Sequence, residues 1–529
     1  MSKRTTVLGF VLLGLLLAGV MTYTLTSRAV RIDEYSTREQ APRIYPDYCS
    51  TVIPPNIAPL NFMVQEKGSR YFVKIYSAKG QPIEVSSRSP KISIPLEPWH
   101  KLLDANRGSD LHFDVFVKAD KNTWTKFGTI TNKIANEDVD NYLVYRKMNP
   151  TRLMIRGRTG IYQRNLSNFD EKMVLNNHNP TSVCANCHTF CGNHTDKMLI
   201  GVRPVRGDQV TLYIENGKAQ KIGANFGYTS WHPSGKLAVY SVINIPMFFH
   251  TVRNEIRDTA NLKSALAYFL TDSKTLKTSP EISREDRQEI WPAWSADGRY
   301  LYFCSTQAPE IYKDDVPPEG YTKVKYDLVR ISYDLEQDKW GDVETVLSSQ
   351  DTGLSIAMPR TSPDGRWLTF CMCEYEFFPT WQEDSDIYIM DLKAAEESGQ
   401  YEYRKLDLNS DRSESWPGWS SNSRWIVFSS KRDKDGVFTR SYIGYIDQNG
   451  KAYKPLVLPQ KDPEFYGYCL EAFNTPEFAI EPIPVTAEAL TRIIRGADEI
   501  PVTLPITMAT PKGGKVISPN YGDYGMKPQ

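Results

Sequence analysis

The sequence has no excess of charge of either sign, because 63 lysine and arginine residues balance 63 aspartate and glutamate residues along 529 positions. Proteins that bind nucleic acids or anionic surfaces electrostatically carry a basic patch that raises the charge of the binding domain. The balance therefore argues against DNA or RNA as a partner.

Motifs of several enzyme classes are also missing. The chain has no G-x-S-x-G nucleophile elbow, no H-E-x-x-H zinc-protease motif and no G-x-x-x-x-G-K-[ST] phosphate-binding loop. A hydrolase, protease or kinase of these types therefore lacks support in the sequence. We predict an electron-transfer or binding protein rather than a catalyst.

Cysteine and histidine are scarce, at 8 and 7 residues, yet three of them fall in Cys184-Ala185-Asn186-Cys187-His188. Two cysteines separated by two residues and followed by histidine form the pattern for covalent haem c attachment. With this composition, the number of chance matches expected is on the order of 0.002. We predict one covalent haem c on Cys184 and Cys187, with His188 as the proximal iron ligand.

The ligand on the other side of the iron is open. Met198, at the start of an apolar stretch, is the first candidate because a thioether suits electron transfer. His178 and His194 are alternatives. Packing of Met198 in a core explains it equally well, since methionine fills cores readily. A vacant position would favour binding of a small molecule.

A zinc site is the main alternative to haem. Cys191 and His194 follow the motif closely, so Cys184, Cys187, Cys191 and His194 form a set of four ligands suited to zinc. An iron-sulfur cluster fits less well, because the fourth cysteine of a ferredoxin run is missing.

The N-terminus bears on this choice, because covalent haem attachment takes place outside the cytoplasm. Lys3 and Arg4 precede an uncharged apolar stretch, Thr5–Ser27, long enough to cross a bilayer. We predict a signal anchor over residues 1–27 in the inner (cytoplasmic) membrane, a linker over 28–48 and a periplasmic body.

Residues 49–148 contain short β-branched and aromatic segments separated by turn residues, which predict a β-sandwich-like domain. Pro95–His100, with two prolines, is expected to be a connection. The haem segment, 149–200, is short for a separate cytochrome domain. A neighbouring domain is therefore expected to shield one side of the haem.

An internal repeat follows, in which a tight turn leads into an alternating strand. Four copies lie about 60 residues apart, at Trp231–Ser241, Trp294–Cys304, Thr361–Cys371 and Trp419–Ser429. This interval suits four-stranded blades, so we predict a β-propeller of about six blades over 201–482. A C-terminal helix and tail are expected over 483–529.

The repeats resemble the Trp-Ser-Pro-Asp-Gly repeats of TolB-like (PD40) β-propellers over about residues 225 to 460. The whole arrangement, from anchor to propeller, is similar to bacterial envelope proteins labelled cytochrome c family or cytochrome c biosynthesis. Two copies depart from the pattern: the first has His232-Pro233-Ser234-Gly235, and the last has Asn422-Ser423 in place of Asp-Gly.

Two functions remain open from the sequence. The first is a membrane-anchored periplasmic monohaem cytochrome that exchanges single electrons with a partner protein docked on the propeller. The second is a non-redox envelope scaffold that binds proteins through its propeller, with a zinc or purely structural Cys/His site.

Overall fold

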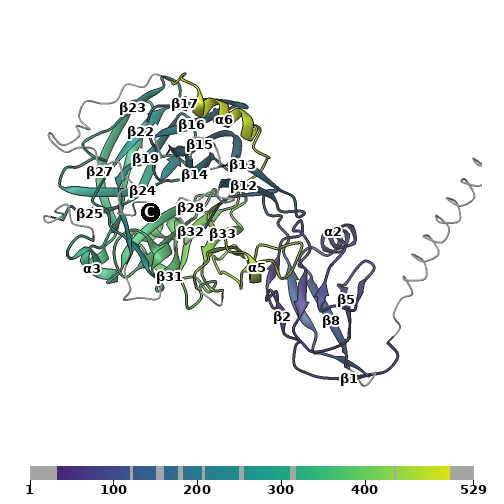
Figure 1. Ribbon diagram of the computed structural model, residues 1–529. Helices are drawn as coiled ribbons and strands as arrows, with labels where there is room; N and C mark the ends of the chain where they lie inside the picture. Colours follow the sequence, from purple (N-terminus) through teal and green to yellow (C-terminus); the bar gives the residue numbers. More distant parts are fainter. Residues whose placement is uncertain are drawn as a thin grey trace, which may run out of the picture.

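The computed structural model has an N-terminal β domain and a larger propeller domain (Figure 1). Among the described residues, no helix is long and apolar enough to cross a membrane. The predicted anchor over 1–27 lies outside them. The described residues are 32–119, 123–149, 160–176, 183–204, 209–249, 255–309, 317–433 and 436–500.

The N-terminal domain contains two sheets with a shared apolar core. The ring of Phe113, in the larger sheet, packs edge-on against that of Phe62, in the smaller one. The larger sheet has seven strands: β1 (Tyr35–Thr37), β3 (Val52–Ile53), β5 (Arg70–Tyr76), β6 (Ile83–Ser87), β8 (Asp110–Lys118), β9 (Trp124–Lys126) and β10 (Ile130–Ile134). The smaller has β2 (Ile44–Tyr45), β4 (Phe62–Val64) and β7 (Lys91–Ile92).

Two sequence expectations differ from this domain. The predicted linker, 28–48, contributes β1 and β2 to its sheets. The connection expected at Pro95–His100 is instead the start of helix α2 (Leu96–Ala105). Prolines are tolerated in the first turn of a helix, where their missing N–H has no intrahelical partner. Trp99 of α2 is fully buried, and its Nε1 donates to the Ile57 carbonyl oxygen at 3.0 Å.

The propeller has six four-stranded antiparallel blades, which confirms the mainly β prediction and the expected count of about six. Blade 1 is β36 (Ala472–Ala479), β11 (Tyr142–Met148), β12 (Gly160–Asn165) and β13 (Glu171–Asn176). Blade 2 is β14 (Val183–Cys191), β15 (His194–Pro204), β16 (Val210–Glu215) and β17 (Lys218–Ile222). Blade 3 is β18 (Thr229–Trp231), β19 (Leu237–Asn244), β22 (Lys263–Leu270) and β23 (Thr275–Lys277).

The remaining three blades follow the same order from the axis outward. Blade 4 is β24 (Arg287–Trp294), β25 (Tyr300–Gln307), β26 (Asp327–Asp334) and β27 (Lys339–Leu347). Blade 5 is β28 (Ser355–Thr361), β29 (Trp367–Cys373), β30 (Asp386–Asp391) and β31 (Tyr403–Lys405). Blade 6 is β32 (Glu414–Trp419), β33 (Trp425–Ser430), β34 (Arg440–Tyr445) and β35 (Leu456–Val457).

The ring closes through blade 1, where β36 near the end of the chain pairs with β11. The inner strands then contact one another in the order β36, β14, β18, β24, β28, β32 and back to β36. The segment treated as a haem unit from the sequence, 149–200, supplies β12 and β13 to blade 1 and β14 and part of β15 to blade 2. The cysteine motif therefore lies on an inner strand.

Smaller elements cover the edges of the blades. Helix α6 (Ala487–Arg495), within the expected C-terminal region, contacts β13 and β17. The others are α3 (Ser349–Thr352), α4 (Leu392–Ser398), α5 (Phe465–Tyr468), the hairpin β20 (Met247–Phe249) and β21 (Arg257–Thr259), and the 3₁₀ turns η1 (Tyr321–Lys323) and η2 (Pro379–Trp381).

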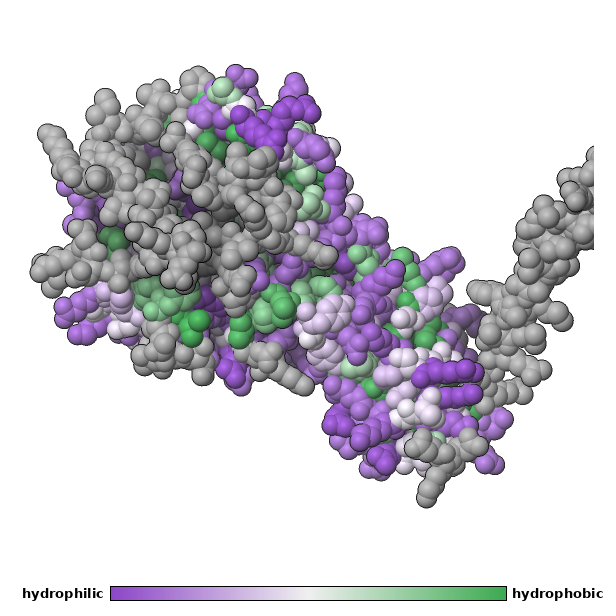
Figure 2. Space-filling model, viewed as in Figure 1, coloured by the Kyte–Doolittle hydropathy of each residue, from purple (hydrophilic) through white to green (hydrophobic). Residues whose placement is uncertain are grey.

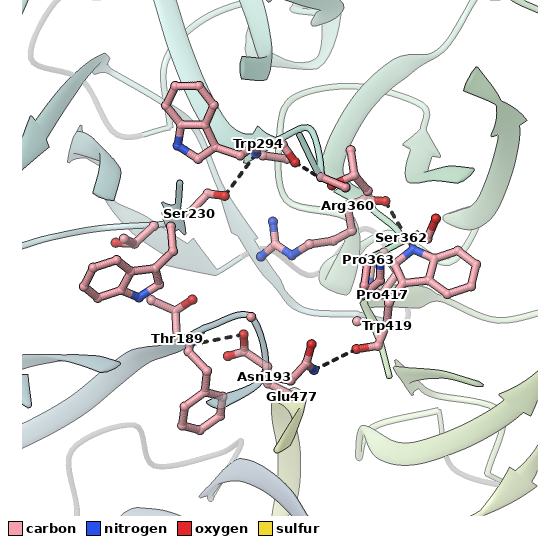
Figure 3. A pocket seen from close by; sticks show the side chains of 18 of the residues that line it. Thr189, Asn193, Ser230, Trp294, Arg360, Ser362, Pro363, Pro417, Trp419 and Glu477 are labelled. Atoms are coloured by element: carbon pink, nitrogen blue, oxygen red, sulfur yellow. Dashed lines mark hydrogen bonds between the residues drawn. The ribbon is translucent and has the colours of Figure 1, made fainter. Parts of the chain in front are cut away.

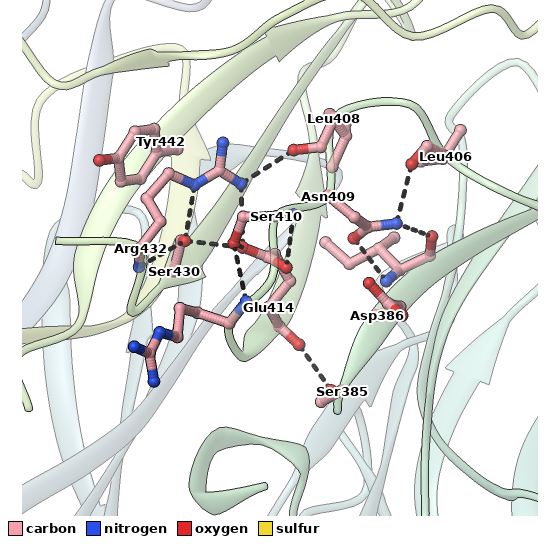
Figure 4. A network of polar contacts seen from close by, with 12 residues as sticks. Ser385, Asp386, Leu406, Leu408, Asn409, Ser410, Glu414, Ser430, Arg432 and Tyr442 are labelled. Carbon is pink, nitrogen blue, oxygen red and sulfur yellow. Dashed lines mark hydrogen bonds and ion pairs between the residues drawn. The ribbon is translucent and has the colours of Figure 1, made fainter. Parts of the chain in front are cut away.

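The buried residue Glu414 links blade 6 to blade 5 through its side chain and its backbone (Figure 4). Glu414, with no exposed surface, accepts hydrogen bonds from Ser410, Ser430 and Arg432 at 2.7 to 2.9 Å. Its backbone carbonyl oxygen accepts from Ser385 of blade 5 at 2.7 Å. A buried charge is tolerated where it is paired and hydrogen-bonded in this way.

The two domains meet at blade 6. Trp425 Nε1 donates to the Glu137 carbonyl oxygen at 3.2 Å, and the Tyr445 hydroxyl donates to the Glu137 carboxylate at 3.1 Å. A single apolar cluster includes Ile53 of the N-terminal domain and Trp425 of blade 6. On the face that Figure 2 presents, hydrophilic and hydrophobic residues are interspersed over both domains.

The repeated turns share one hydrogen-bond pattern. In blade 4, Ser295 Oγ donates to the Asp297 carboxylate at 2.6 Å, and Gly298 takes a positive φ of 73°. The equivalent pairs are Ser362 with Asp364 and Ser420 with Asn422. In the divergent last copy, Ser423 takes a φ of 59°, and its hydroxyl accepts from the Asp364 N–H at 2.9 Å. That contact accounts for serine in place of glycine.

The first copy has His232 where the others have serine, and its ring packs against the blade 4 turn. His232 Nε2 lies 3.2 Å from the Gly298 carbonyl oxygen. A Cβ atom added at Gly298 would lie 2.3 Å from His232 Nε2, whereas one added at Gly353, with a φ of 71°, would meet no atom within 4 Å.

We predict that Gly298→Ala lowers the free energy of unfolding more than Gly353→Ala does. Both replacements carry the backbone cost of positive φ, about 1 kcal/mol. Gly298→Ala adds a clash with the His232 ring, worth about 1–3 kcal/mol for overpacking. Urea unfolding of both variants measures the difference. Equal losses would contradict the packing of His232 on this turn.

Candidate functional site

A cavity of about 300 Å³ lies on the propeller axis, lined by residues from the inner strands of all six blades (Figure 3). Its lining includes residues of the turns between the first and second strands of three blades, such as Pro233, Ser295 and Pro363. Small-molecule sites usually measure about 300–1,000 Å³, so this cavity is at the small end of that range.

The inner strands bend at one bulge position that recurs around the ring. Trp291, Met358, Trp416 and Thr475 all take φ between 48° and 61°, each is followed by proline, and the strand pairing shifts there. Bulges of this kind redirect side chains and concentrate near functional sites. The residues directly after these prolines, Ala293, Arg360, Gly418 and Glu477, line the cavity.

A bulge also sets the direction of His188. Ala185 pairs with Val202 and His188 pairs with Ile200, although three residues separate them on β14 and only two on β15. In a regular strand, residues three apart face opposite sides of the sheet. The extra residue at Cys187 therefore places His188 on the same face as Ala185.

His188 is buried, with 6% of its surface exposed, and it lines the cavity. Among the described residues, neither ring nitrogen has a well-formed hydrogen bond, although the Val144 carbonyl lies close enough to act on the ring. Burial lowers the pKa of His188 to about 4, and the nearby Val144 carbonyl opposes this only in part. The imidazole is therefore neutral at pH 7, which is the form that binds metal ions. These properties fit an iron ligand.

The other predicted ligands are distributed as follows. Cys184 and Cys187 lie on β14, and their side chains are outside the described part of the structure, as is His178. Met198 is fully buried in an apolar cluster with Phe190 and Ile200 and does not line the cavity. Met198 is therefore placed as the alternative from the sequence describes it, as a residue packed in a core.

Two of the four zinc candidates have other neighbours. Cys191 Sγ lies 4.0 Å from the His232 carbonyl oxygen, and the exposed His194 pairs through Nδ1 with Glu481 at 3.1 Å. Among the residues that the structure describes, no group of three or more His, Cys, Asp or Glu side chains is arranged to hold a metal ion. The zinc alternative stays a prediction that depends on Cys184 and Cys187.

Glu477 is the acidic residue of the cavity and lies where blade 1 meets blade 2. Its carboxylate accepts from the Phe190 N–H of β14 at 3.5 Å. It lines the cavity and is partly buried, and burial raises its pKa to about 7, although Arg360, the Phe190 N–H and the Thr189 hydroxyl oppose the shift.

Two residues that line the cavity, Tyr228 and Trp416, form an aromatic group with Trp291. Tyr228 stacks on Trp291 with ring centroids 3.4 Å apart, and Trp416 packs against both. Trp416 Nε1 donates to Thr380 Oγ1 at 2.9 Å, and Trp291 Nε1 donates to the Phe377 carbonyl oxygen at 2.9 Å. The segment 374–385 thus holds two rings of this aromatic group through Phe377 and Thr380.

Sequence reasoning identified His188 but missed Arg360 and Glu477. A second repeat carries the missing signal, and its four copies are Trp291-Pro292, Met358-Pro359, Trp416-Pro417 and Thr475-Pro476. The first three precede a repeated turn, and the fourth lies on β36, the inner strand of blade 1. The next position is alanine or glycine in two copies and charged in the other two. Aligning the copies would have singled out Arg360 and Glu477.

The sequence matches no known protein family and no curated protein. Similar solved structures include puromycin hydrolase, at 12% identity over 62% of this chain and 54% of that one, with a TM-score of 0.34. Oligogalacturonate lyase from Vibrio parahaemolyticus shows 14% identity over 73% and 100%, with a TM-score of 0.29. An auxiliary nutrient binding protein from Bacteroides thetaiotaomicron shows 9% identity over 78% and 98%, with a TM-score of 0.32. No functional argument follows from similarities this low.

We predict that Glu477→Gln changes how stability depends on pH. A carboxyl group whose pKa rises from 4.5 to about 7 on folding stabilises the protein fully below pH 4.5, and this contribution is lost as pH rises through 7. Urea unfolding at pH 5 and pH 8, in a Cys184→Ala/Cys187→Ala chain, measures the effect.

The free energy of unfolding of Glu477→Gln, relative to that of its parent, should rise by about 1–3 kcal/mol from pH 5 to pH 8. Glu481→Gln, which removes an exposed carboxylate from the same region, is the control. A Glu477→Gln effect that does not vary with pH would contradict the burial of this carboxyl group.

Proposed function

We propose that the chain is a monohaem c-type cytochrome-like protein, with thioether bonds from Cys184 and Cys187 and with His188 as the iron ligand. The imidazole of His188 carries the proposal, because it directly follows the two cysteines, lines the axial cavity and, among the described residues, has no well-formed hydrogen bond at either ring nitrogen. An unpaired buried polar group costs about 1–3 kcal/mol. Coordination to a metal ion would remove that cost for one nitrogen.

The chain's own residues contribute binding and environment. A bound haem c supplies one-electron chemistry. Burial keeps His188 neutral and ready to coordinate. Inner strands of all six blades line the cavity, and the aromatic side chains of Tyr228 and Trp416 are part of that lining. Low polarity and limited solvent access are among the factors by which a protein sets a haem potential.

The proposal includes a location and a partner. Covalent haem attachment requires export, so residues 1–27 would anchor the chain in the inner membrane and the body would lie in the periplasm. A redox protein docked on the propeller, at the open end of the cavity, would exchange electrons with the haem. The TolB-like resemblance of the repeat is part of the same proposal.

We predict that the full chain, expressed with c-type maturation machinery, retains haem on a denaturing gel and has redox-sensitive absorption bands. Cys184→Ala/Cys187→Ala should lose the haem, because both thioether bonds are gone. Cys191→Ala is the matched control, since it removes a thiol from the same strand but outside the motif, and it should keep the haem.

Two results would contradict the haem proposal. One is haem-free protein from cells in which a control cytochrome matures normally. The other is one zinc ion per chain that both Cys191→Ala and Cys184→Ala/Cys187→Ala abolish, which would support the zinc-bound scaffold instead.

We also predict that Met198→Leu leaves the absorption spectrum of the loaded protein unchanged. Met198 is buried among apolar side chains, and leucine has a similar volume, so stability should fall by less than about 1.5 kcal/mol. Absorption spectra of both oxidation states provide the test. A changed spectrum in a normally folded Met198→Leu protein would identify Met198 as the distal ligand.

A further inference from the structure

Blade 3 carries an insertion that reaches the opposite side of the ring. Its hairpin, β20 and β21, lies in the connection between β19 and β22. We call residues 255–261, which lead through β21 back to β22, the strap. Lys431, directly after β33 of blade 6, donates to the Glu255 carboxylate of the strap. Blades 3 and 6 are three places apart in the ring of six, so the strap links opposite blades.

The strap also contacts the two blades that lie between blades 3 and 6. The Asp258 carboxylate accepts from the hydroxyl of Tyr321, in blade 4, at 2.9 Å and from that of Tyr375, in blade 5, at 2.7 Å. Asn261 Nδ2 donates to the hydroxyl of Tyr326, in blade 4, at 2.8 Å. The strap is therefore held by hydrogen bonds along its length as well as at its tip.

Most of the strap is buried. Residues 257–261 are each at most 7% exposed. Connections usually run over the surface, because a buried connection takes its backbone groups away from water. Burial of five successive residues indicates that the strap is packed into the end of the propeller and does not run around its rim.

The strap lies at the end of the propeller opposite the repeated turns. The inner strands run from this end to the turns, and the second strands run back. Gln288, at the start of inner strand β24, donates to the Asn261 carbonyl oxygen at 2.8 Å. Tyr375 and Lys431 follow the ends of the second strands β29 and β33. These contacts are therefore at the other end of the blades from the turn residues of the cavity, such as Ser295.

The segment 374–385 of blade 5 connects the strap to the cavity. On one side, it holds the rings of Trp291 and Trp416 through hydrogen bonds. On the other side, the Glu376 carboxylate accepts from the Asn261 N–H at 3.3 Å. The aromatic group, this segment and the strap thus form a continuous series of contacts from the cavity to the end of the propeller.

The contact of the strap with blade 6 is a buried ion pair. The side chains of Lys431 and Glu255 are 5% and 8% exposed. Burial lowers the pKa of Lys431 to about 8, although Glu255 opposes the shift, so the ammonium is mostly charged at pH 7. Removal of one partner from a buried ion pair is strongly destabilising. Lys431 is therefore the residue through which blade 6 fastens the strap.

We propose that the strap and the segment 374–385 form a plug that closes this end of the axial channel, and that the ion pair between Lys431 and Glu255 is its clasp. Release of the clasp lets both segments move together and opens a second entrance to the cavity. With the clasp closed, a molecule or a partner protein reaches His188 only from the end that carries the repeated turns. The plug requires neither haem nor zinc at the cysteine motif.

Hydrogen–deuterium exchange of the full chain, followed by mass spectrometry, tests whether the plug is one unit. The parent chain carries Cys184→Ala/Cys187→Ala, so that no group bound at the cysteines affects the result. Segments that open together exchange through one shared opening. The exchange rates of the strap and of 374–385 should therefore rise with the same dependence on urea. Different dependences would overturn the plug.

Lys431→Met in the same parent tests the clasp. Exchange in the strap and in 374–385 should become about 10-fold faster or more, because the clasp no longer holds the closed form, while exchange in β15 of blade 2 stays unchanged. Lys277→Met is the matched control, since it breaks an ion pair with Asp338 that is 41% and 28% exposed and also joins two blades. It should leave exchange in both segments unchanged.

Modification of His188 by diethyl pyrocarbonate measures the second entrance, because the reagent attacks neutral imidazole and His188 is neutral at pH 7. The rate should be about 3-fold higher or more in Lys431→Met than in the parent or in Lys277→Met. Circular dichroism establishes that each variant is folded. Unchanged exchange in folded Lys431→Met, or unchanged modification of His188 despite faster exchange, would overturn the proposal. If Lys431→Met does not fold, the urea dependence of the parent still decides whether the plug exists.

Discussion

The candidate site depends on the pairing of β36 with β11, which joins the C-terminal part of the propeller to its first blade. This pairing completes blade 1 with a strand from the far end of the chain, so that the six blades form one ring. Closure also places β36 next to β14, so that Glu477 meets the Phe190 N–H. Residues almost 290 positions apart in sequence therefore share one cavity, and His188 lies beside this junction.

The bulges of the inner strands determine what the cavity contains. A regular strand alternates its side chains, and most inner-strand side chains would then point into the packed layers between blades. At the bulges, a residue with positive φ followed by proline breaks the alternation, at a cost of about 1–3 kcal/mol for each strained residue. The ring therefore stores strain at the positions that aim Arg360 and Glu477 inward, and the extra residue at Cys187 has the same effect on His188.

The sequence predicted the repeated turns of the propeller, because these turns form through contacts between residues that lie close together in the chain. The turns at Ser295 and Ser362 form through contacts within five residues, so their repeat indicated the propeller and a count of about six. Blades 1 and 2 lack the Trp-Ser-Pro-Asp-Gly turn, and blade 1 exists only through a strand at the other end of the chain. For that reason the sequence assigned 149–200 to a separate segment. Helix α2 was missed because two prolines masked it, although both fall where a helix accepts them.

The cysteine motif was readable from sequence, but its surroundings were not, because they come from five other blades. Those surroundings give the cavity an uneven charge. Burial makes His188 neutral and holds Glu477 near half-ionisation at pH 7, while the guanidinium of Arg360 stays charged. Arg360 also opposes the rise in the pKa of Glu477, so the two charged groups of the described lining act on each other. The groups that act on Glu477 lie on blades 5 and 2, because Arg360 belongs to β28 and both Thr189 and Phe190 belong to β14. The charge of the cavity is therefore set by tertiary packing, and no local sequence pattern determines it.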